Sequence, residues 1–144
     1  MKVLFVCEGN VGRSQMAEGI FRELSDGEYK AFSAGTLVIQ GDDHSRVGKK
    51  LGDTVGAENV LAVLKEIGID ASEYVRKPVT QELVETADKV VVMATEATVP
   101  EYLKESQKAI FWDVADPFEQ SVECTRDIRN QILVQIEELV TSMK

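Results

Sequence analysis

Residues 3–14 read Val-Leu-Phe-Val-Cys-Glu-Gly-Asn-Val-Gly-Arg-Ser, and this stretch carries the strongest fold signal in the chain. Its first four residues, Val3 to Val6, form a run of β-branched, aromatic and aliphatic side chains typical of a strand buried on both faces. Beyond the stretch, apolar residues recur at helical spacing, which predicts an amphipathic helix that begins near Ser14 and carries Ala17, Ile20, Phe21 and Leu24 on one face. A strand, a short loop and a helix are therefore expected in succession.

The loop of this predicted unit has the composition of an anion cradle. A loop that leads from a strand into a helix N-terminus gathers backbone N–H groups into one concavity, which favours a bound anion. The positive end of the helix also favours Cys7 as a nucleophilic thiolate. Arg13 offers a planar fork of donors that suits two oxygens of a phosphate. We therefore predict an oxyanion cradle with Cys7 at its floor, suited to attack on phosphorus or arsenic and lined by Glu8, Gly9, Asn10, Val11, Gly12 and Arg13.

A nucleotide-binding P-loop does not fit the same residues. That motif requires Gly-x4-Gly-Lys followed by Ser or Thr. Here Gly9 and Gly12 are too close together, and Arg13 occupies the place of the lysine.

Three landmarks carry a resemblance to a known family. Cys-x5-Arg-Ser after a strand, the tetrad SAGT at Ser33–Thr36 and the pair Asp116-Pro117 occur in the order found in the low-molecular-weight protein tyrosine phosphatases and the arsenate reductases that share their fold. The chain resembles this family over nearly its whole length. The resemblance implies a flavodoxin-like α/β fold, the phosphotyrosine phosphatase I fold, with four strands in the order 2-1-3-4. It also implies that Ser33 braces Asn10 and that Asp116 is the general acid.

The rest of the chain alternates between strand and helix signals, which implies a parallel sheet covered on both faces, in three layers. At 144 residues the chain fits a single domain, 1–144. Further strands are predicted at 29–34, 89–94 and 109–114, the last with Phe111 and Trp112 in the core. One helix is predicted at 60–67, ended by Gly68, and another at 81–87, capped by Thr80. A short helix is predicted just after a capping box at Thr98, and a last helix is predicted from Ser121 to Met143.

These residues suit a two-step displacement. Cys7 would attack phosphorus to form a phosphocysteine, while loop N–H groups and Arg13 stabilise the oxygens. Ser14 would donate to the sulfur and improve it as a leaving group. Asp116 would protonate the departing oxygen and then take a proton from water. Phe118 would form an apolar wall for the substrate, and neither a metal nor an organic cofactor is needed.

The composition of the chain argues against several classes of binding partner and metal site. The formal net charge of −9 argues against a nucleic acid or an anionic membrane. The one histidine, His44, excludes a His-rich metal site and reads as a solvated loop residue. No signal peptide or membrane span is indicated, and two distant cysteines, Cys7 and Cys124, make no disulfide framework. We therefore expect a cytoplasmic monomer or weak dimer, with Cys124 as a packing residue.

The substrate stays open between several classes. Val11 resembles the phosphotyrosine-specific members, whereas Asp116-Pro-Phe118 and residues 78–93 look more like a branch that hydrolyses phosphoarginine in proteins. A small phosphomonoester is a further possible substrate. Arsenate reduction would need an external thiol, because the segment 94–100 carries no cysteine. A third hypothesis is a non-catalytic phosphate-binding module. The resemblance also implies that residues 35–58 form one wall of the active-site cleft.

Overall fold

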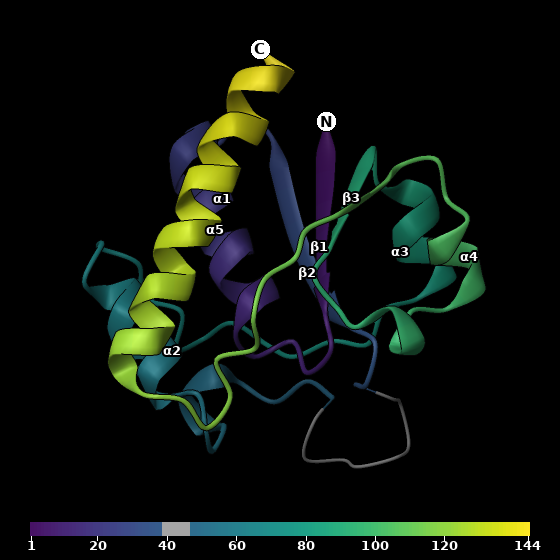
Figure 1. The fold of residues 1–144 in the computed structure, drawn as a ribbon. Coiled ribbons are helices and arrows are strands. Elements are labelled where there is room, and N and C mark those ends of the chain that lie inside the picture. The colour runs from purple at the N-terminus through teal and green to yellow at the C-terminus, as the bar shows by residue number, and fades with distance from the viewer. Residues whose placement is uncertain (39–46) are drawn as a thin grey trace.

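A computed structural model describes residues 1–38 and 47–144 (Figure 1). One parallel sheet has the strand order β2-β1-β3-β4, which confirms the predicted order and direction. Its strands are β1 (Lys2–Cys7), β2 (Lys30–Gly35), β3 (Lys89–Val92) and β4 (Ala109–Phe111). His44 and the adjoining part of the predicted loop 35–58 lie outside the described residues.

Helices cover both faces of the sheet in three layers, as predicted (Figure 1). α1 (Arg13–Ser25), α2 (Glu58–Lys65) and the long α5 (Val122–Met143) lie on one side, and α3 (Gln81–Thr86) and α4 (Glu101–Lys104) lie on the other. Short 3-10 turns at Leu51–Asp53 and Glu96–Thr98 complete the elements. No helix in the described ranges is long and apolar enough to cross a membrane.

Alternation along β1 explains why this strand is central. Val3, Phe5 and Cys7 belong to the core beneath α1 and α5, whereas Leu4 and Val6 belong to the core beneath α3 and α4. Successive side chains of a strand point to opposite faces, so a strand in the middle of a three-layer fold must be apolar throughout. This strand therefore ends in the interior of the molecule, and Cys7 is only 2% exposed.

Most predicted boundaries are confirmed. Thr80 caps α3 by accepting from Leu83 N, Ser121 caps α5 by accepting from Cys124 N, and Gly68 follows α2 with a φ of 82°. The capping box predicted at Thr98 is wrong, because α4 begins after Pro100. The Thr98 hydroxyl instead bonds to Thr36 Oγ1 and Thr95 O.

The last strand is shorter than predicted and less buried. β4 ends at Phe111, whose side chain is half exposed because it lies at the carboxyl end of an edge strand. The prediction that Phe111 is a core residue is therefore wrong. Trp112 does pack against the core, with its ring centroid 6.5 Å from that of Phe5.

Candidate active site

The thiol of Cys7 lies at the junction between β1 and α1. Its Sγ is 3.0 Å from Ser14 Oγ, in the first turn of α1. Ser14 Oγ accepts from Asn10 Nδ2 at 2.7 Å, so the hydroxyl proton of Ser14 remains available for the sulfur. The Ser14 hydroxyl is therefore placed to donate a hydrogen bond to the Cys7 sulfur.

The loop between Cys7 and Arg13 turns its carbonyl oxygens away from its concave side. The carbonyl oxygens of Cys7, Glu8, Gly9 and Asn10 accept, respectively, from Thr36 N, Leu37 N, the Arg76 guanidinium and Gln15 Nε2. In a planar trans peptide the N–H points opposite to the C=O. The N–H groups of residues 8–11 therefore face the concave side, where together they can bind an oxyanion.

Asn10 is the residue that gives this loop its left-handed backbone conformation. Its φ of 53° is left-handed, and its side chain is fully buried. Its Oδ1 accepts from Lys77 N at 2.8 Å and from Gln15 Nε2 at 3.2 Å, while its Nδ2 donates to Ser14. The amide is thus held from three directions, which fixes the backbone conformation that the anion cradle needs.

The predicted brace between Ser33 and Asn10 is wrong. In the part of the chain that the structure describes, the buried Ser33 Oγ has no hydrogen-bond partner. Ser33 lies opposite Phe5 in the sheet, whereas Gly35 lies opposite Cys7. The Asn10 amide is already occupied by Lys77, Gln15 and Ser14, so Ser33 is not needed there.

Gly35 is the member of the SAGT tetrad that contacts the loop. A Cβ at this position would lie 2.5 Å from Glu8 O and 3.1 Å from Asn10 Cβ. Real Cβ atoms do not approach a backbone oxygen this closely, so the loop can pack on β2 only where the strand carries a glycine.

Arg13 is buried and held by the carboxyl ends of two strands. Its Nη1 donates to Met93 O at 2.7 Å, just after β3, and to Val114 O at 3.1 Å, beyond β4. Its Nη2 lies 3.4 Å from Glu8 Oε1 and 3.7 Å from Asp116 Oδ2. The guanidinium is therefore fixed in orientation before any ligand binds, with two carboxylates near Nη2.

Glu8 is anchored by the segment after β3. Its Oε1 accepts from Thr95 Oγ1 at 2.6 Å and from Thr95 N at 3.1 Å. The hydrogen bond from the Thr95 side chain is the main reason that the pKa of Glu8 is lowered, and Arg13 adds to the effect. Glu8 is thus ionised at neutral pH.

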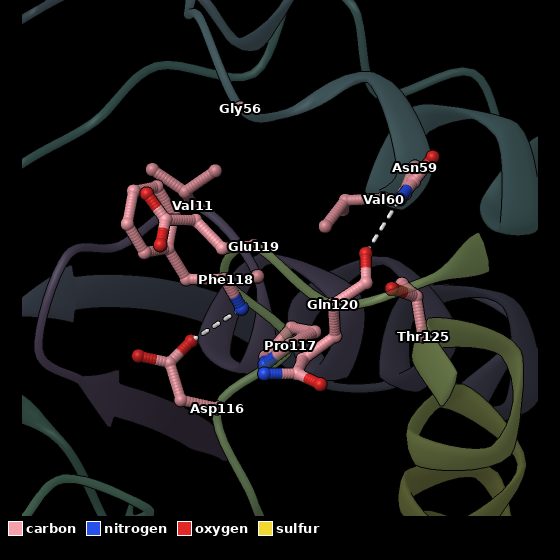
Figure 2. A pocket seen from close by; sticks show the side chains of 11 residues that line it. Val11, Gly56, Asn59, Val60, Asp116, Pro117, Phe118, Glu119, Gln120 and Thr125 are labelled. Atoms are coloured by element: carbon pink, nitrogen blue, oxygen red, sulfur yellow. Dashed lines mark hydrogen bonds between the residues drawn. The ribbon is translucent and has the colours of Figure 1, made fainter. Parts of the chain in front are cut away.

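Asp116 reaches the loop from the opposite side of the crevice. It begins a tight turn in which its Oδ1 accepts from Phe118 N at 3.0 Å (Figure 2). Asn59 of α2 donates to Gln120 O at 3.1 Å, which ties down the far end of this turn. Pro117 packs on Gly12, where an added Cβ would lie 2.9 Å from Pro117 Cγ. The turn is thereby held against the anion loop, although the Asp116 side chain is 56% exposed.

A cavity of about 350 Å³ opens above Cys7. The sequence-predicted residues Cys7, Glu8, Gly9, Val11, Gly12, Arg13, Asp116 and Phe118 all line it, together with Leu37, Val55, Gly56 and Arg76. Asn10, Ser14 and Ser33 are buried behind the loop. Val55 and Phe118 are strongly exposed and give the cavity an apolar rim. A smaller cavity of about 130 Å³ adjoins it beside the Asp116 turn (Figure 2).

Sequence reasoning missed the residues that support the loop from a distance. Gln15, Arg76, Lys77 and Thr95 contact it, but three of them are separated from it by more than sixty positions in the chain. Gln15 carried a weak signal, because a buried glutamine in the first turn of a helix needs polar partners. Cys124 packs at the edge of the core, and both cysteines are free thiols. Across residues 1–38 and 47–144, no cluster of acidic, histidine and cysteine side chains could hold a metal ion.

Comparison with known proteins places this geometry in a family. The family model described as low molecular weight phosphotyrosine protein phosphatase matches residues 2–144. The chain belongs to this family. It is therefore a cysteine-dependent enzyme of the low molecular weight phosphatase type, and its fold is the one that the resemblance implied.

Relatives of this phosphatase-family chain have more than one activity. The glutaredoxin arsenate reductase of Synechocystis sp. is 30% identical over 146 residues, which cover 99% of this chain and 98% of that protein. The low molecular weight protein tyrosine phosphatase from T. tengcongensis is 30% identical, with a TM-score of 0.80 over 99% of each chain. The YwlE arginine phosphatase from Geobacillus stearothermophilus is 25% identical, with a TM-score of 0.78 over 99% of this chain and 92% of that chain.

Proposed function

We propose that residues 1–144 form one catalytic domain that hydrolyses phosphomonoesters through a phosphocysteine intermediate. One observation carries the proposal: the Cys7 sulfur lies 3.0 Å from a serine hydroxyl at the floor of a loop whose carbonyl oxygens are turned outward. A thiolate beneath converging N–H groups is placed to attack the atom whose oxygens those groups bind.

In the first step, the Cys7 thiolate attacks phosphorus and the bond from phosphorus to the leaving oxygen breaks. Asp116 gives its proton to that oxygen, and the N–H groups of the loop and Arg13 stabilise the three remaining oxygens. In the second step, water attacks phosphorus, Asp116 takes a proton from the water, and the bond from phosphorus to sulfur breaks. Ser14 lowers the cost of that last step, because its hydroxyl can donate to the departing thiolate. No metal or organic cofactor takes part in this scheme.

The substrate we favour is an aryl phosphate, such as phosphotyrosine in a protein. Val11, Val55 and Phe118 line the cavity and offer apolar contacts to a ring attached to the phosphate. The likeness to the T. tengcongensis tyrosine phosphatase supports this choice. Phosphoarginine is the second candidate, favoured by the likeness to the YwlE arginine phosphatase.

Arsenate reduction is a candidate because of the likeness to the Synechocystis reductase. It would require an external thiol, since Cys124 is the one other cysteine of the chain and packs in the first turn of α5. A reducing, cytoplasmic location suits a mechanism that depends on a free thiol. The strongly negative net charge disfavours nucleic acids and anionic membranes as partners. We propose that the protein works as a monomer or weak dimer.

A side-by-side turnover assay tests the proposal. The wild type is expected to hydrolyse p-nitrophenyl phosphate and phosphotyrosine faster than phosphoarginine, and to reduce little arsenate without an added small thiol or redoxin. Cys7→Ser should abolish turnover yet still bind phosphate, because the backbone cradle remains. Cys124→Ala is the matched control and should leave turnover nearly unchanged. Turnover by Cys7→Ser near the wild-type rate would refute the thiolate mechanism, and one arsenate reduced per chain in thiol-free buffer would favour the reductase.

Asp116 is tested by varying the leaving group. Asp116→Asn should slow hydrolysis of phosphotyrosine by about 10²–10⁴-fold, and should slow p-nitrophenyl phosphate much less, since nitrophenolate leaves without a proton. An equal loss on both substrates would make Asp116 structural, and Glu119 would then be the next candidate for the general acid.

A further inference from the structure

Two carboxylates share the guanidinium of Arg13, whereas the other guanidinium that lines the cavity, that of Arg76, donates to Gly9 O. Among the described residues, the carboxylates within 4.0 Å of Arg13 are those of Glu8 and Asp116, and both lie closest to Nη2. The charge of Arg13 therefore faces two negative charges before any ligand arrives. Those two charges oppose the binding of a dianion at Arg13, because like charges weaken binding strongly in a partly buried site.

The two carboxylates differ in how freely they can move. The Asp116 side chain is 56% exposed, and Asp116 is the group that carries a proton in the proposed reaction. Glu8 is 22% exposed and is fixed by two hydrogen bonds from Thr95. Those bonds lower its pKa, so Glu8 stays ionised at neutral pH. Glu8 is thus the permanent negative charge at the rim of the cradle.

We propose that Glu8 is a built-in counter-ion of Arg13 that weakens binding of phosphate and so speeds its release as product. The proposal rests on the proposed phosphatase function. The fixed Glu8 carboxylate repels a bound phosphate dianion that contacts the same guanidinium. Two like charges a few ångströms apart, in surroundings less polar than water, shift a binding equilibrium by at least about tenfold.

Glu8→Gln removes the negative charge of the side chain and keeps its size and shape. The glutamine carbonyl oxygen can accept the same hydrogen bonds from Thr95 N and Thr95 Oγ1, so the loop keeps its anchor. The dissociation constant of inorganic phosphate, measured by calorimetric titration at pH 7, is expected to fall about tenfold or more. In turnover of p-nitrophenyl phosphate, KM and the inhibition constant of phosphate should fall together, while kcat does not rise.

Glu96→Gln is the matched control. Glu96 is exposed and follows Thr95 directly, but it is not an ion-pair partner of Arg13. Its replacement by glutamine changes the net charge by the same amount as Glu8→Gln does. Its phosphate affinity should stay within about twofold of wild type. Thr95→Val is a second route to the same effect, because it removes one of the two hydrogen bonds that hold the Glu8 carboxylate in place. It should tighten phosphate binding less than Glu8→Gln does.

The direction in which the phosphate affinity of Glu8→Gln changes distinguishes a counter-ion role of Glu8 from a structural one. If Glu8 merely shaped the loop, its loss would weaken phosphate binding; unchanged or weaker binding by Glu8→Gln therefore overturns the proposal. So does an equal gain in Glu96→Gln. If the wild type hydrolyses no phosphomonoester but phosphate still binds more tightly to Glu8→Gln, the counter-ion role stands and the proposed function fails. If the wild type hydrolyses phosphomonoesters while Glu8→Gln binds phosphate no better, only the counter-ion role is wrong.

Discussion

Asn10 offers the most quantitative test of how the anion loop is held. Its backbone is left-handed, and its side chain makes hydrogen bonds with Lys77 N, Gln15 Nε2 and Ser14 Oγ. Asn10→Gly removes these bonds but leaves a residue that adopts a left-handed backbone readily. Asn10→Ala removes the same bonds and adds the strain of a left-handed alanine.

Asp26 supplies the reference for the backbone effect alone. It is also left-handed, with a φ of 50°, and it lies at the exposed end of α1, away from the cavity. The difference in stability between alanine and glycine should therefore be similar at the two sites. The three side-chain hydrogen bonds at Asn10 contribute about 1 kcal/mol each. Asn10→Gly is thus expected to lose about 3 kcal/mol more stability than Asp26→Gly.

Urea unfolding followed by circular dichroism measures the free energy of unfolding of the four variants, which are the glycine and alanine substitutions at Asn10 and at Asp26. A loss of about 3 kcal/mol leaves a domain of ordinary stability folded, so activity can be measured on the same samples. Asn10→Gly should lose most turnover of p-nitrophenyl phosphate, whereas Asp26→Gly should keep it. If Asn10→Gly is within about 1 kcal/mol of Asp26→Gly, or retains full turnover, the hydrogen-bond network does not hold the loop.

Three further outcomes follow from particular contacts. Gly12→Ala should push Pro117 away and misplace Asp116, lowering kcat for phosphotyrosine by about 10²-fold while p-nitrophenyl phosphate suffers less, as steady-state kinetics would show. Ser33→Ala removes a buried hydroxyl without a partner, so urea unfolding should show unchanged or slightly raised stability. Glu66 accepts hydrogen bonds from Arg126 and Arg129, which lower its pKa from 4.5 to about 2. Its stabilising effect is therefore present above pH 4.5 and is lost as pH falls toward about 2, so the difference in unfolding free energy between wild type and Glu66→Gln should shrink over that range.

The contiguous part of the site could be predicted from the sequence because its chemistry is local. A buried strand followed by a glycine-containing loop and a helix places Cys7 and Arg13 at one end of a parallel sheet without knowledge of any other segment. The strand order followed from the family resemblance, and the structure confirms it. The role of Asp116 was likewise implied by the family resemblance, and its place after the last strand is consistent with that role, because the carboxyl ends of parallel strands lie at one edge of the sheet.

The supporting contacts could not be predicted because backbone atoms make most of them. Met93 and Val114 hold Arg13 through their carbonyl oxygens, and Lys77 holds Asn10 through its N–H, so the identity of these side chains carries no signal. The error at Ser33 has the opposite cause. The family resemblance implied a hydrogen bond from the serine of the SAGT tetrad, whereas the property of that tetrad on which the loop depends is the missing side chain of Gly35.

Arg13 links the two halves of the proposed chemistry. Through Met93 and Val114 its guanidinium is fixed to the ends of the two strands that lead to the Glu8 anchor and to the Asp116 turn, respectively. Gly12 gives the turn a second contact through Pro117. An exposed aspartate would otherwise sample many positions, but here its turn is held from the loop, from α2 and from the segment after β4. Arg13 and Asp116, the groups proposed to bind the phosphate oxygens and to protonate the leaving oxygen, therefore keep their spacing, because both are positioned by the same short loop.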